Sequence, residues 1–251
     1  MDQKEDSELW SLGVTMFTPA GEQILLNERA NCIAAEIFLK MCDIHSTTEE
    51  RANTEYMSPN GDVPFIKCGN ELVAGMENIV DFFKSKNISL SSHLDEQKQR
   101  DCRVYMNYFQ LELTNSELYF TWCHDKVTQE YTYPRCTSVY SWPLNSILYM
   151  MKKRNITKKL KLQKITDIEQ ATKSVEKVFT KLSEILIGPY FFGNKPTELD
   201  ALIFGHISAI LTTALPDDSL AILVRENQPL VNLCNLIGAE YFPSILTTED
   251  Q

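Results

Sequence analysis

The sequence predicts an α+β protein, with a small α/β domain in the first third of the chain and an all-helical domain after it. Pro64 opens the apolar segment Val63–Ile66. A proline within a sheet pattern belongs at a strand start or an edge, because it cannot donate to the ladder. In the C-terminal half, Thr197 and Asp200 form a capping-box-like helix start, with Asp in place of the usual Glu or Gln, and the longest apolar helical segment follows.

The composition is that of a folded soluble protein and narrows the functional classes. Apolar residues make up 43% and charged residues 23% of the 251 residues. The net charge of −10 disfavours a nucleic-acid partner. The longest apolar run, 201–211, is too short and too polar to span a bilayer, and the acidic N-terminus resembles neither a secretory signal nor a transit peptide.

Hydrophobic periodicity and turn residues define the elements of the first domain. We expect an N-terminal arm or short strand over 1–20 and an α/β domain over 21–88. Within that domain, the expected elements are a strand at 23–26, a helix at 30–41, a second strand within 44–50, two strands at 63–66 and 72–73, and a helix from 79 to 87. The two later strands should pair as a hairpin, because a Gly-Asn turn joins them.

The second domain is predicted to be helical throughout. A Ser- and Asn-rich linker at 86–94 precedes it, and we place the domain at 92–245 with a tail at 246–251. The expected helices lie at 94–123, 144–153, 165–187, 197–215 and 230–241, and an aromatic, proline-bearing loop at 131–142.

This layout resembles that of glutathione transferases, whose N-terminal domain is thioredoxin-like and carries a cis proline at the position of Pro64. A closer resemblance, to the metaxin family, extends from about residue 20 to 242. It is carried by the segments 22–26, 51–59, 63–66, 141–145, 189–192 and 196–201. The segment Arg51–Pro59 is typical of the metaxin 2 branch.

The resemblance implies a thioredoxin-like domain followed by an all-α glutathione-transferase C-terminal-like domain. It also implies a non-enzymatic adaptor at the cytosolic face of the mitochondrial outer membrane, held peripherally and with some cytosolic pool. The implied roles are protein import, β-barrel sorting and assembly, and mitochondrial transport. The implied partners are a membrane-anchored protein of the metaxin 1 type, the outer-membrane assembly machinery and mitochondrial transport proteins.

The residues that a transferase needs to ionise a thiol are missing from the expected place. Transferases lower the thiol pKa of glutathione with a Tyr, Ser or Cys at the start of the first helix. Here the segment Asn27–Cys32 offers only Cys32, and the carboxylate of Glu28 would disfavour a thiolate. We therefore expect no catalytic residue. The alternatives are a divergent glutathione transferase or thiol reductase that uses Cys32, and a plain structural homodimer.

The site for the γ-glutamyl carboxylate also departs from the transferase pattern. Transferases place Glu or Gln and then Ser at the start of the helix after the fourth strand, where helix amides favour an anion. The matching positions here are Gly75 and Met76, followed by Glu77. Methionine cannot hydrogen-bond a carboxylate and glutamate would repel it, so we expect no glutathione cofactor.

The histidines and cysteines do not predict a metal site. The four histidines (45, 93, 124 and 206) are far apart, and the seven cysteines contain no CxxC motif. The cysteine pattern is typical of a reducing compartment, with a disulfide scaffold as the alternative. We expect His206 to be a hydrogen-bonded core residue.

A basic strip at 152–164 stands out in this acidic chain. It contains seven basic residues and no acidic one: Lys152, Lys153, Arg154, Lys158, Lys159, Lys161 and Lys164. It is either a solvated helix end or a contact surface for anionic lipid headgroups or an acidic partner. Tyr140 and Trp142 in the aromatic loop are candidate docking residues. Core packing is the alternative for both, and we favour it for Trp142.

Overall fold

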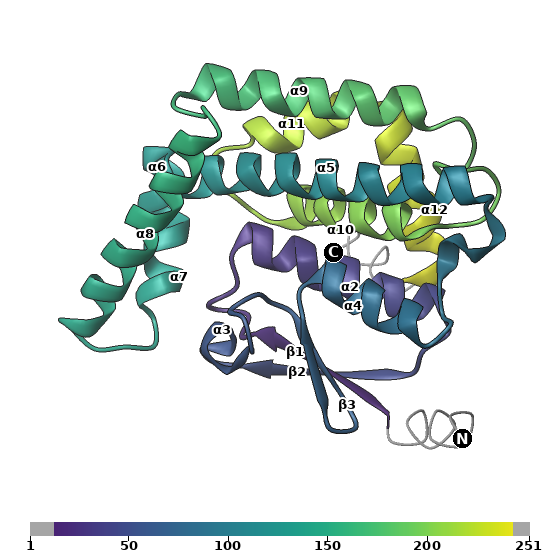
Figure 1. Cartoon of the computed structure of the whole chain (residues 1–251). Coiled ribbons are helices and arrows are strands. Elements are labelled where there is room, and N and C mark those ends of the chain that lie inside the picture. The colour runs from purple at the N-terminus through teal and green to yellow at the C-terminus, as the bar shows by residue number, and fades with distance from the viewer. Residues whose placement is uncertain (1–12, 243–251) are drawn as a thin grey trace, which may run out of the picture.

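The computed structural model describes residues 13–242, with a four-stranded sheet at one end and helices making up the rest (Figure 1). The strands are Val14–Pro19 (β1), Ser46–Arg51 (β2), Phe65–Cys68 (β3) and Glu71–Ala74 (β4). Their order in the sheet is β2-β1-β3-β4. β1 is parallel to β2 and antiparallel to β3, and β3 is antiparallel to β4. The mixed sheet with its helical body confirms the predicted fold class.

The first strand lies earlier than the sequence pattern predicted. Residues 23–26 were expected to form a strand, which is wrong: the backbone N–H groups of Gln23 and Ile24 donate to Ala20 in a turn. The helix Leu26–Met41 (α2) begins directly after this turn. The strand is β1 instead, and it occupies an interior position in the sheet rather than lying on the body as an arm. Residues 1–12 of the expected arm lie outside the described residues, as does the 246–251 tail.

The other predicted elements of the sheet region are present with shifted ends, and the helix at 54–57 was not predicted. β3 and β4 form the expected hairpin, and Gly69 takes the positive φ of 60° in its turn. The Val63–Pro64 peptide bond is cis, and β3 begins at the next residue. Two helices, α2 and Met76–Ser85 (α4), pack between the sheet and the helical body, and the short helix Thr54–Met57 (α3) follows β2 (Figure 1).

The body consists of helices joined by short connections. They are Leu90–His93 (η1), Glu96–Trp122 (α5), Asp125–Val127 (α6), Thr128–Thr132 (η2), Tyr133–Thr137 (α7), Leu144–Leu162 (α8), Ile168–Ile185 (α9), Glu198–Thr212 (α10), Ser219–Glu226 (α11) and Gln228–Tyr241 (α12). The expected loop at 131–142 is helical as far as Thr137. α8 continues past the predicted end at 153, because Lys, Arg and Leu in 153–162 are good helix formers.

The capping box of α10 forms as predicted and is buried. The backbone N–H of Thr197 donates to Asp200 Oδ2 at 2.8 Å, and the Thr197 hydroxyl donates to the same oxygen at 2.7 Å. The other carboxylate oxygen of Asp200 accepts the Phe191 N–H at 3.0 Å. One carboxylate therefore fixes both the start of α10 and the loop that precedes it.

α10 is the centre of the molecule and joins the body to α2. The two helices come closest at Gly205, where a Cβ atom would lie 2.5 Å from Ala30 O and from Ala34 N. On its other side, His206 Nδ1 lies 2.6 Å from Glu117 Oε1 in α5, with both side chains buried. His206 is thus hydrogen-bonded in the core, as expected.

Within residues 13–242, every helix falls short of the length or the apolar character that crossing a membrane requires.

Candidate functional site

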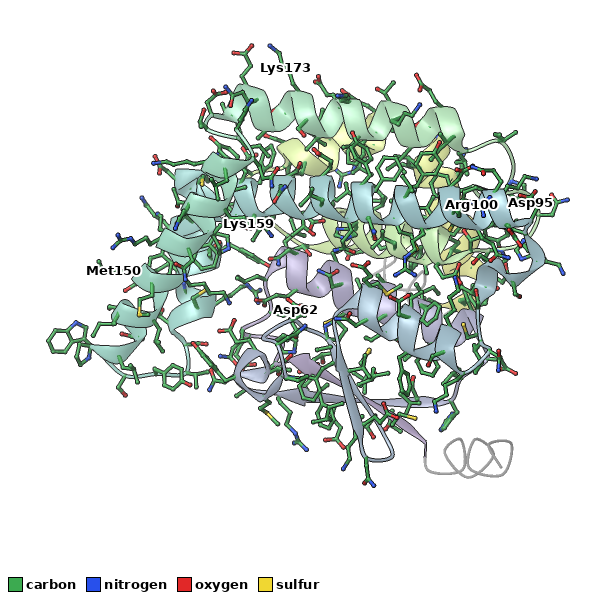
Figure 2. All side chains as sticks on the ribbon, in the orientation of Figure 1. Asp62, Asp95, Arg100, Met150, Lys159 and Lys173 are labelled. Carbon is green, nitrogen blue, oxygen red and sulfur yellow. The ribbon has the colours of Figure 1, made fainter. Side chains whose placement is uncertain are left out.

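A cleft of about 700 Å³ separates the sheet side of the molecule from the helical body. α2, α3, the segment 61–63 and the start of α4 form one wall, while α5 and α8 form the opposite wall. Asp62 and Lys159, which line the two walls, are labelled in Figure 2. We call this space the central cleft.

The two walls of the central cleft differ in chemistry. The sheet side is rich in carboxylates and amides: Asn27, Glu28, Asn31, Glu55, Asp62, Glu77 and Asn78. The helical side is largely apolar, with Met106, Leu111, Leu118, Trp122 and Ile156. It also carries Asn107, Gln110, Thr114 and the two lysines Lys152 and Lys159. A cleft with an acidic wall does not favour an anionic ligand.

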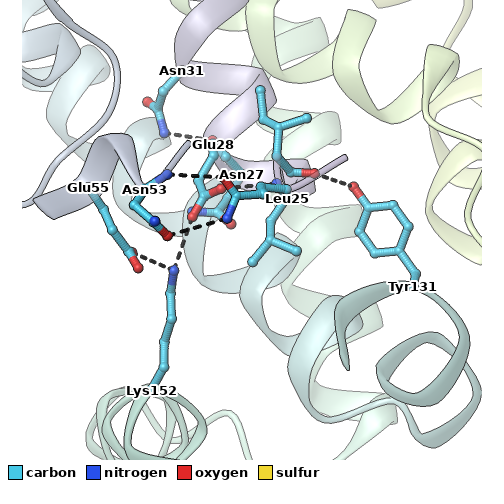
Figure 3. Close-up of polar contacts among 10 residues, drawn as sticks. Leu25, Asn27, Glu28, Asn31, Asn53, Glu55, Tyr131 and Lys152 are labelled. Atoms are coloured by element: carbon cyan, nitrogen blue, oxygen red, sulfur yellow. Dashed lines mark hydrogen bonds and ion pairs between the residues drawn. The ribbon is translucent and has the colours of Figure 1, made fainter. Parts of the chain in front are cut away.

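Lys152 lines the central cleft and bridges two carboxylates. Its Nζ atom lies 2.6 Å from Glu55 Oε2 and 3.3 Å from Glu28 Oε1 (Figure 3). The second oxygen of Glu28 accepts the N–H of Leu25 at 3.0 Å, at the start of α2. Although burial alone would lower the pKa of Lys152, the carboxylates of Glu28 and Glu55 outweigh that effect and raise it. The lysine is therefore a fixed cation that ties α8 to α2 and α3.

The position of Cys32 makes it a poor nucleophile. Only 6% of its surface is exposed. Burial raises the pKa of the Cys32 thiol well above its usual value, and the charges of Glu28 and Glu36 raise it further against the opposing effect of Arg29. Since the thiolate is the reactive form, this environment counts against the Cys32 alternative. All seven cysteines are free thiols, and Cys32, Cys68, Cys102 and Cys234 are buried.

The amide end of α4 is surrounded by groups that disfavour a bound carboxylate. Met76, at the first helical position, is buried and offers no hydrogen-bond donor from its side chain. Asp62 packs beside Gly75, where a Cβ atom would lie 3.3 Å from Asp62 Oδ2. Glu77 follows in the first turn. The positive end of the helix dipole thus faces acidic side chains rather than an open anion site.

The structure divides the basic strip between two sides of α8. Lys152, which is partly buried, and Lys159, which is exposed, line the central cleft. Arg154, Lys158 and Lys161 are exposed and do not line it. The Nζ atom of Lys153 lies 5.9 Å from the Tyr149 ring centroid. Lys164, in the left-handed conformation with a φ of 60°, follows the end of the helix. Lys152 is engaged within the molecule, so its assignment as an outside contact needs correction.

The two aromatic candidates lie in different surroundings. Tyr140 is half-buried and lines a small pocket of about 60 Å³ beside Glu55 and Tyr56. Trp142 is 80% exposed, so the expectation that it packs in the helical core is wrong. It lies in the corner between α7 and α8, which projects from the body (Figure 1). No neighbouring helix covers that corner among the described residues.

Sequence reasoning missed two features of this region. Glu55 was not identified as a partner of Lys152, because 97 positions separate them and only the packing of α8 against α3 brings them together. The exposed apolar residues of the corner were also missed: Val139, Leu144, Ile147, Met150 and Met151. A signal for them was present, since residues 139–151 include no charged residue. With Trp142, we call this set the apolar corner.

Within 13–242, His, Cys, Asp and Glu side chains form no group of three or more that could hold a metal ion.

Comparisons with known proteins relate the whole chain to one family. The family model described as outer mitochondrial membrane transport complex protein matches residues 32–153, and a glutathione S-transferase C-terminal domain model matches 175–237. Human metaxin-2 is 40% identical over 241 residues, covering 94% of this chain and 91% of the relative. The Caenorhabditis elegans metaxin-2 homolog is 36% identical over 208 residues, covering 79% and 88%.

A solved structure supports the fold alone. Na-GST-3, a glutathione S-transferase from the hookworm Necator americanus, superimposes with a TM-score of 0.55 at 10% sequence identity, covering 95% of this chain and 98% of that one. This likeness agrees with the sheet and the helical body described above. The family follows from the sequence relatives: the identity to metaxin-2 proteins over most of the chain shows that the chain belongs to the metaxin family, here with a glutathione-transferase-like fold.

Proposed function

We propose that this protein is a non-enzymatic adaptor at the cytosolic face of the mitochondrial outer membrane, acting in protein import and in β-barrel sorting and assembly. Its proposed partners are a membrane-anchored protein of the metaxin 1 type and the outer-membrane assembly machinery, with mitochondrial transport as a further role. The relatives named metaxin-2 and the outer-membrane transport-complex family model support this location and class of function.

The observation that carries the non-enzymatic part is the Glu28–Lys152–Glu55 cluster in the central cleft. In a transferase, the start of this helix presents the group that activates the glutathione thiol. Here Glu28 and the paired ammonium of Lys152 occupy that place, and Cys32 is buried below it. The fold is retained, while the groups that would hold and ionise a thiol are replaced by an internal ion cluster.

The proposal is tested by cross-linking mass spectrometry on intact mitochondria carrying the tagged protein. We expect cross-links to a membrane-anchored metaxin 1-type protein and to outer-membrane assembly subunits. The same mitochondria, treated with alkaline carbonate, should release the protein, because a peripheral subunit has no spanning contact with lipid. Absence of cross-links to outer-membrane proteins, or cross-links confined to a second copy of this chain, would overturn the adaptor proposal.

A functional measurement completes the test. Cells lacking the protein should import and assemble β-barrel precursors more slowly, and re-expression should restore the rate. The Cys32→Ala variant should restore it equally well, because the thiol has no part in the proposed function. Restoration by the native chain but not by Cys32→Ala would favour the thiol-dependent alternative instead.

A further inference from the structure

The exposed side of α8 carries a single stripe whose chemistry changes along the helix. Residues three or four apart share a face of an α-helix. The stripe begins with the exposed apolar residues Leu144, Ile147 and Met151 and continues, with the same spacing, through the exposed basic residues 154, 158 and 161. Lys152 and Lys159 point to the central cleft instead. On this face the helix is thus apolar over 144–151 and basic over 154–161, and one further exposed apolar residue, Leu162, ends the stripe.

The apolar end of the stripe is enlarged by the corner before it. Trp142 is 80% exposed and Val139 40% exposed, and Met150 is 68% exposed beside the stripe. Met150 is labelled at the outer edge of the molecule in Figure 2, on the side away from the sheet. A contiguous apolar surface of this kind on a folded protein marks an interaction site.

The order of these residues matches the layers of a membrane surface. Interfacial segments place aromatic and aliphatic side chains at the boundary between headgroups and acyl chains, about 5–10 Å deep. The segment Leu144–Met151 extends roughly 10 Å along the helix at 1.5 Å per residue. Arg154, Lys158 and Lys161 then lie about 5–15 Å farther along, at the level of the headgroups. Tryptophan is itself enriched at this boundary, because its ring packs against apolar groups while its N–H can hydrogen-bond to water or headgroups.

The charge of the basic strip favours an anionic lipid leaflet as the binding partner of the corner. The basic strip has seven basic residues and no acidic one, in a chain whose net charge is −10. Basic residues near an anionic leaflet each contribute about 1 kcal/mol. The connection between α7 and α8 also projects from the body (Figure 1). A projecting apolar tip with a basic row behind it suits insertion into a bilayer better than a fit to a second folded surface.

We propose that the apolar corner inserts into an anionic lipid leaflet, with Arg154, Lys158 and Lys161 contacting the headgroup phosphates. This proposal deepens the proposed function, on which it rests for the membrane in question. It assigns the membrane contact of the protein to one corner, and it leaves the remaining surface for protein partners.

The test measures binding of the purified full chain to vesicles of phosphatidylcholine alone and of phosphatidylcholine with phosphatidylserine. We expect binding to the anionic vesicles and little to the neutral ones. The charge variant Arg154→Glu, Lys158→Glu, Lys161→Glu should lose about 100-fold or more in affinity. The corner variant Trp142→Ser, Ile147→Ser, Met151→Ser should lose at least roughly tenfold, because it removes the apolar area that would leave water.

Matched controls separate these effects from general changes in charge or apolar surface. Lys173→Glu, Lys177→Glu, Lys181→Glu changes three exposed lysines on α9, and Val104→Ser, Ile222→Ser, Leu236→Ser changes three exposed apolar residues elsewhere. Each control variant should bind anionic vesicles more tightly than the charge variant or the corner variant that it matches. Circular dichroism and the midpoint of thermal unfolding verify that each variant is folded.

Insertion has a signature that headgroup contact alone lacks. Brominated lipids should quench the tryptophan fluorescence of the native protein, and Trp142→Phe should abolish this quenching while vesicle binding is retained. Vesicle binding unchanged in the corner variant would overturn the proposal, as would equal quenching in Trp142→Phe. Loss of metaxin 1-type partner capture in the corner variant, with vesicle binding intact, would make the corner a protein interface. Vesicle binding without any outer-membrane cross-links would instead contradict the proposed function.

Discussion

Two buried polar groups, Asp200 and Glu117, bind the elements of the helical body to one another. Asp200 accepts hydrogen bonds from the backbone N–H groups of Phe191 and Thr197 and from the Thr197 hydroxyl. Glu117 reaches His206 across the α5–α10 contact. Burying a charged group is costly unless it is hydrogen-bonded or paired. These two residues therefore fix how the loop before α10 and the helices α5 and α10 are positioned, in addition to contributing to stability.

We predict that Asp200→Ala lowers the free energy of unfolding by about 2–4 kcal/mol, since three buried donors lose their acceptor. Urea unfolding followed by circular dichroism measures the change. Asp218→Ala is the matched control, because Asp218 is exposed and its side chain makes no capping bond to α11. Equal stability of the two variants would contradict the role given to the capping box.

Asp200 also predicts a pH dependence of stability. Burial raises the pKa of Asp200 to about 6, despite the hydrogen bonds from Phe191 and Thr197 that lower it. Between about pH 4 and pH 6 the folded state keeps a proton that the unfolded state has lost, so this group makes the protein less stable as the pH rises. The stability difference between the native chain and Asp200→Asn should therefore shrink from pH 4 to pH 6. Urea unfolding at these pH values measures it, and a constant or growing difference would contradict the prediction.

Lys152 provides a third test at the residue scale. Lys152→Met leaves the carboxylates of Glu28 and Glu55 without their cation, and we expect a loss of about 1–3 kcal/mol in the free energy of unfolding, less than for a fully buried pair. The control is Lys158→Met on the exposed side of the same helix, with an expected change within about 0.5 kcal/mol. Indistinguishable unfolding curves for the two variants would show that the cluster does not hold α8.

Among the elements, the sheet region contains one hairpin that the sequence pattern predicted correctly and one strand that it predicted wrongly. The β3–β4 hairpin was predicted correctly, because its Gly69 turn and its alternating residues are neighbours in the chain. The segment 23–26 was assigned as a strand from its apolar residues. Leu25 and Leu26 are indeed buried, but at the start of a helix. A short apolar run fits either element, and the capping contact from Glu28 to Leu25 decides in favour of the helix.

The contact between α10 and α2 yields a prediction for the packing of the two halves. A methyl group at Gly205 would lie 2.5 Å from backbone atoms of α2, which cannot move as a flexible side chain would. We expect Gly205→Ala to lower the free energy of unfolding by about 3 kcal/mol or more. Gly21→Ala is the control, since its nearest neighbour would be the Glu50 carboxylate at 3.9 Å. A Gly205→Ala protein as stable as the control in urea would show that the helices separate freely.

For the molecule as a whole, the structure combines a transferase-like architecture with a cleft of altered chemistry. Around the cis Val63–Pro64 bond and the start of α4, this cleft is lined by Asp62, Met76 and Glu77. The surface in turn carries an exposed apolar corner on α8. We therefore look for the interaction site of this protein on its outer surface rather than in the central cleft.

We predict that the purified protein is not retained on immobilised glutathione and does not turn over a generic thiol-conjugation substrate. An active glutathione transferase provides the positive control on the same resin and substrate. Conjugating activity that disappears in Cys32→Ala would contradict the prediction and restore the enzyme alternative. Activity that persists in Cys32→Ala would point to another group in the central cleft.

The sequence alone determined the fold class, the hairpin and the capping box of α10. These features depend on residues close together in the chain, whose spacing and hydrogen-bonding capacity can be read directly. Only the tertiary structure decided that Lys152 faces Glu28 and Glu55, 124 and 97 positions away, and that Trp142 is exposed. Partners and burial at such positions depend on how whole helices pack, and no local pattern in the sequence records that.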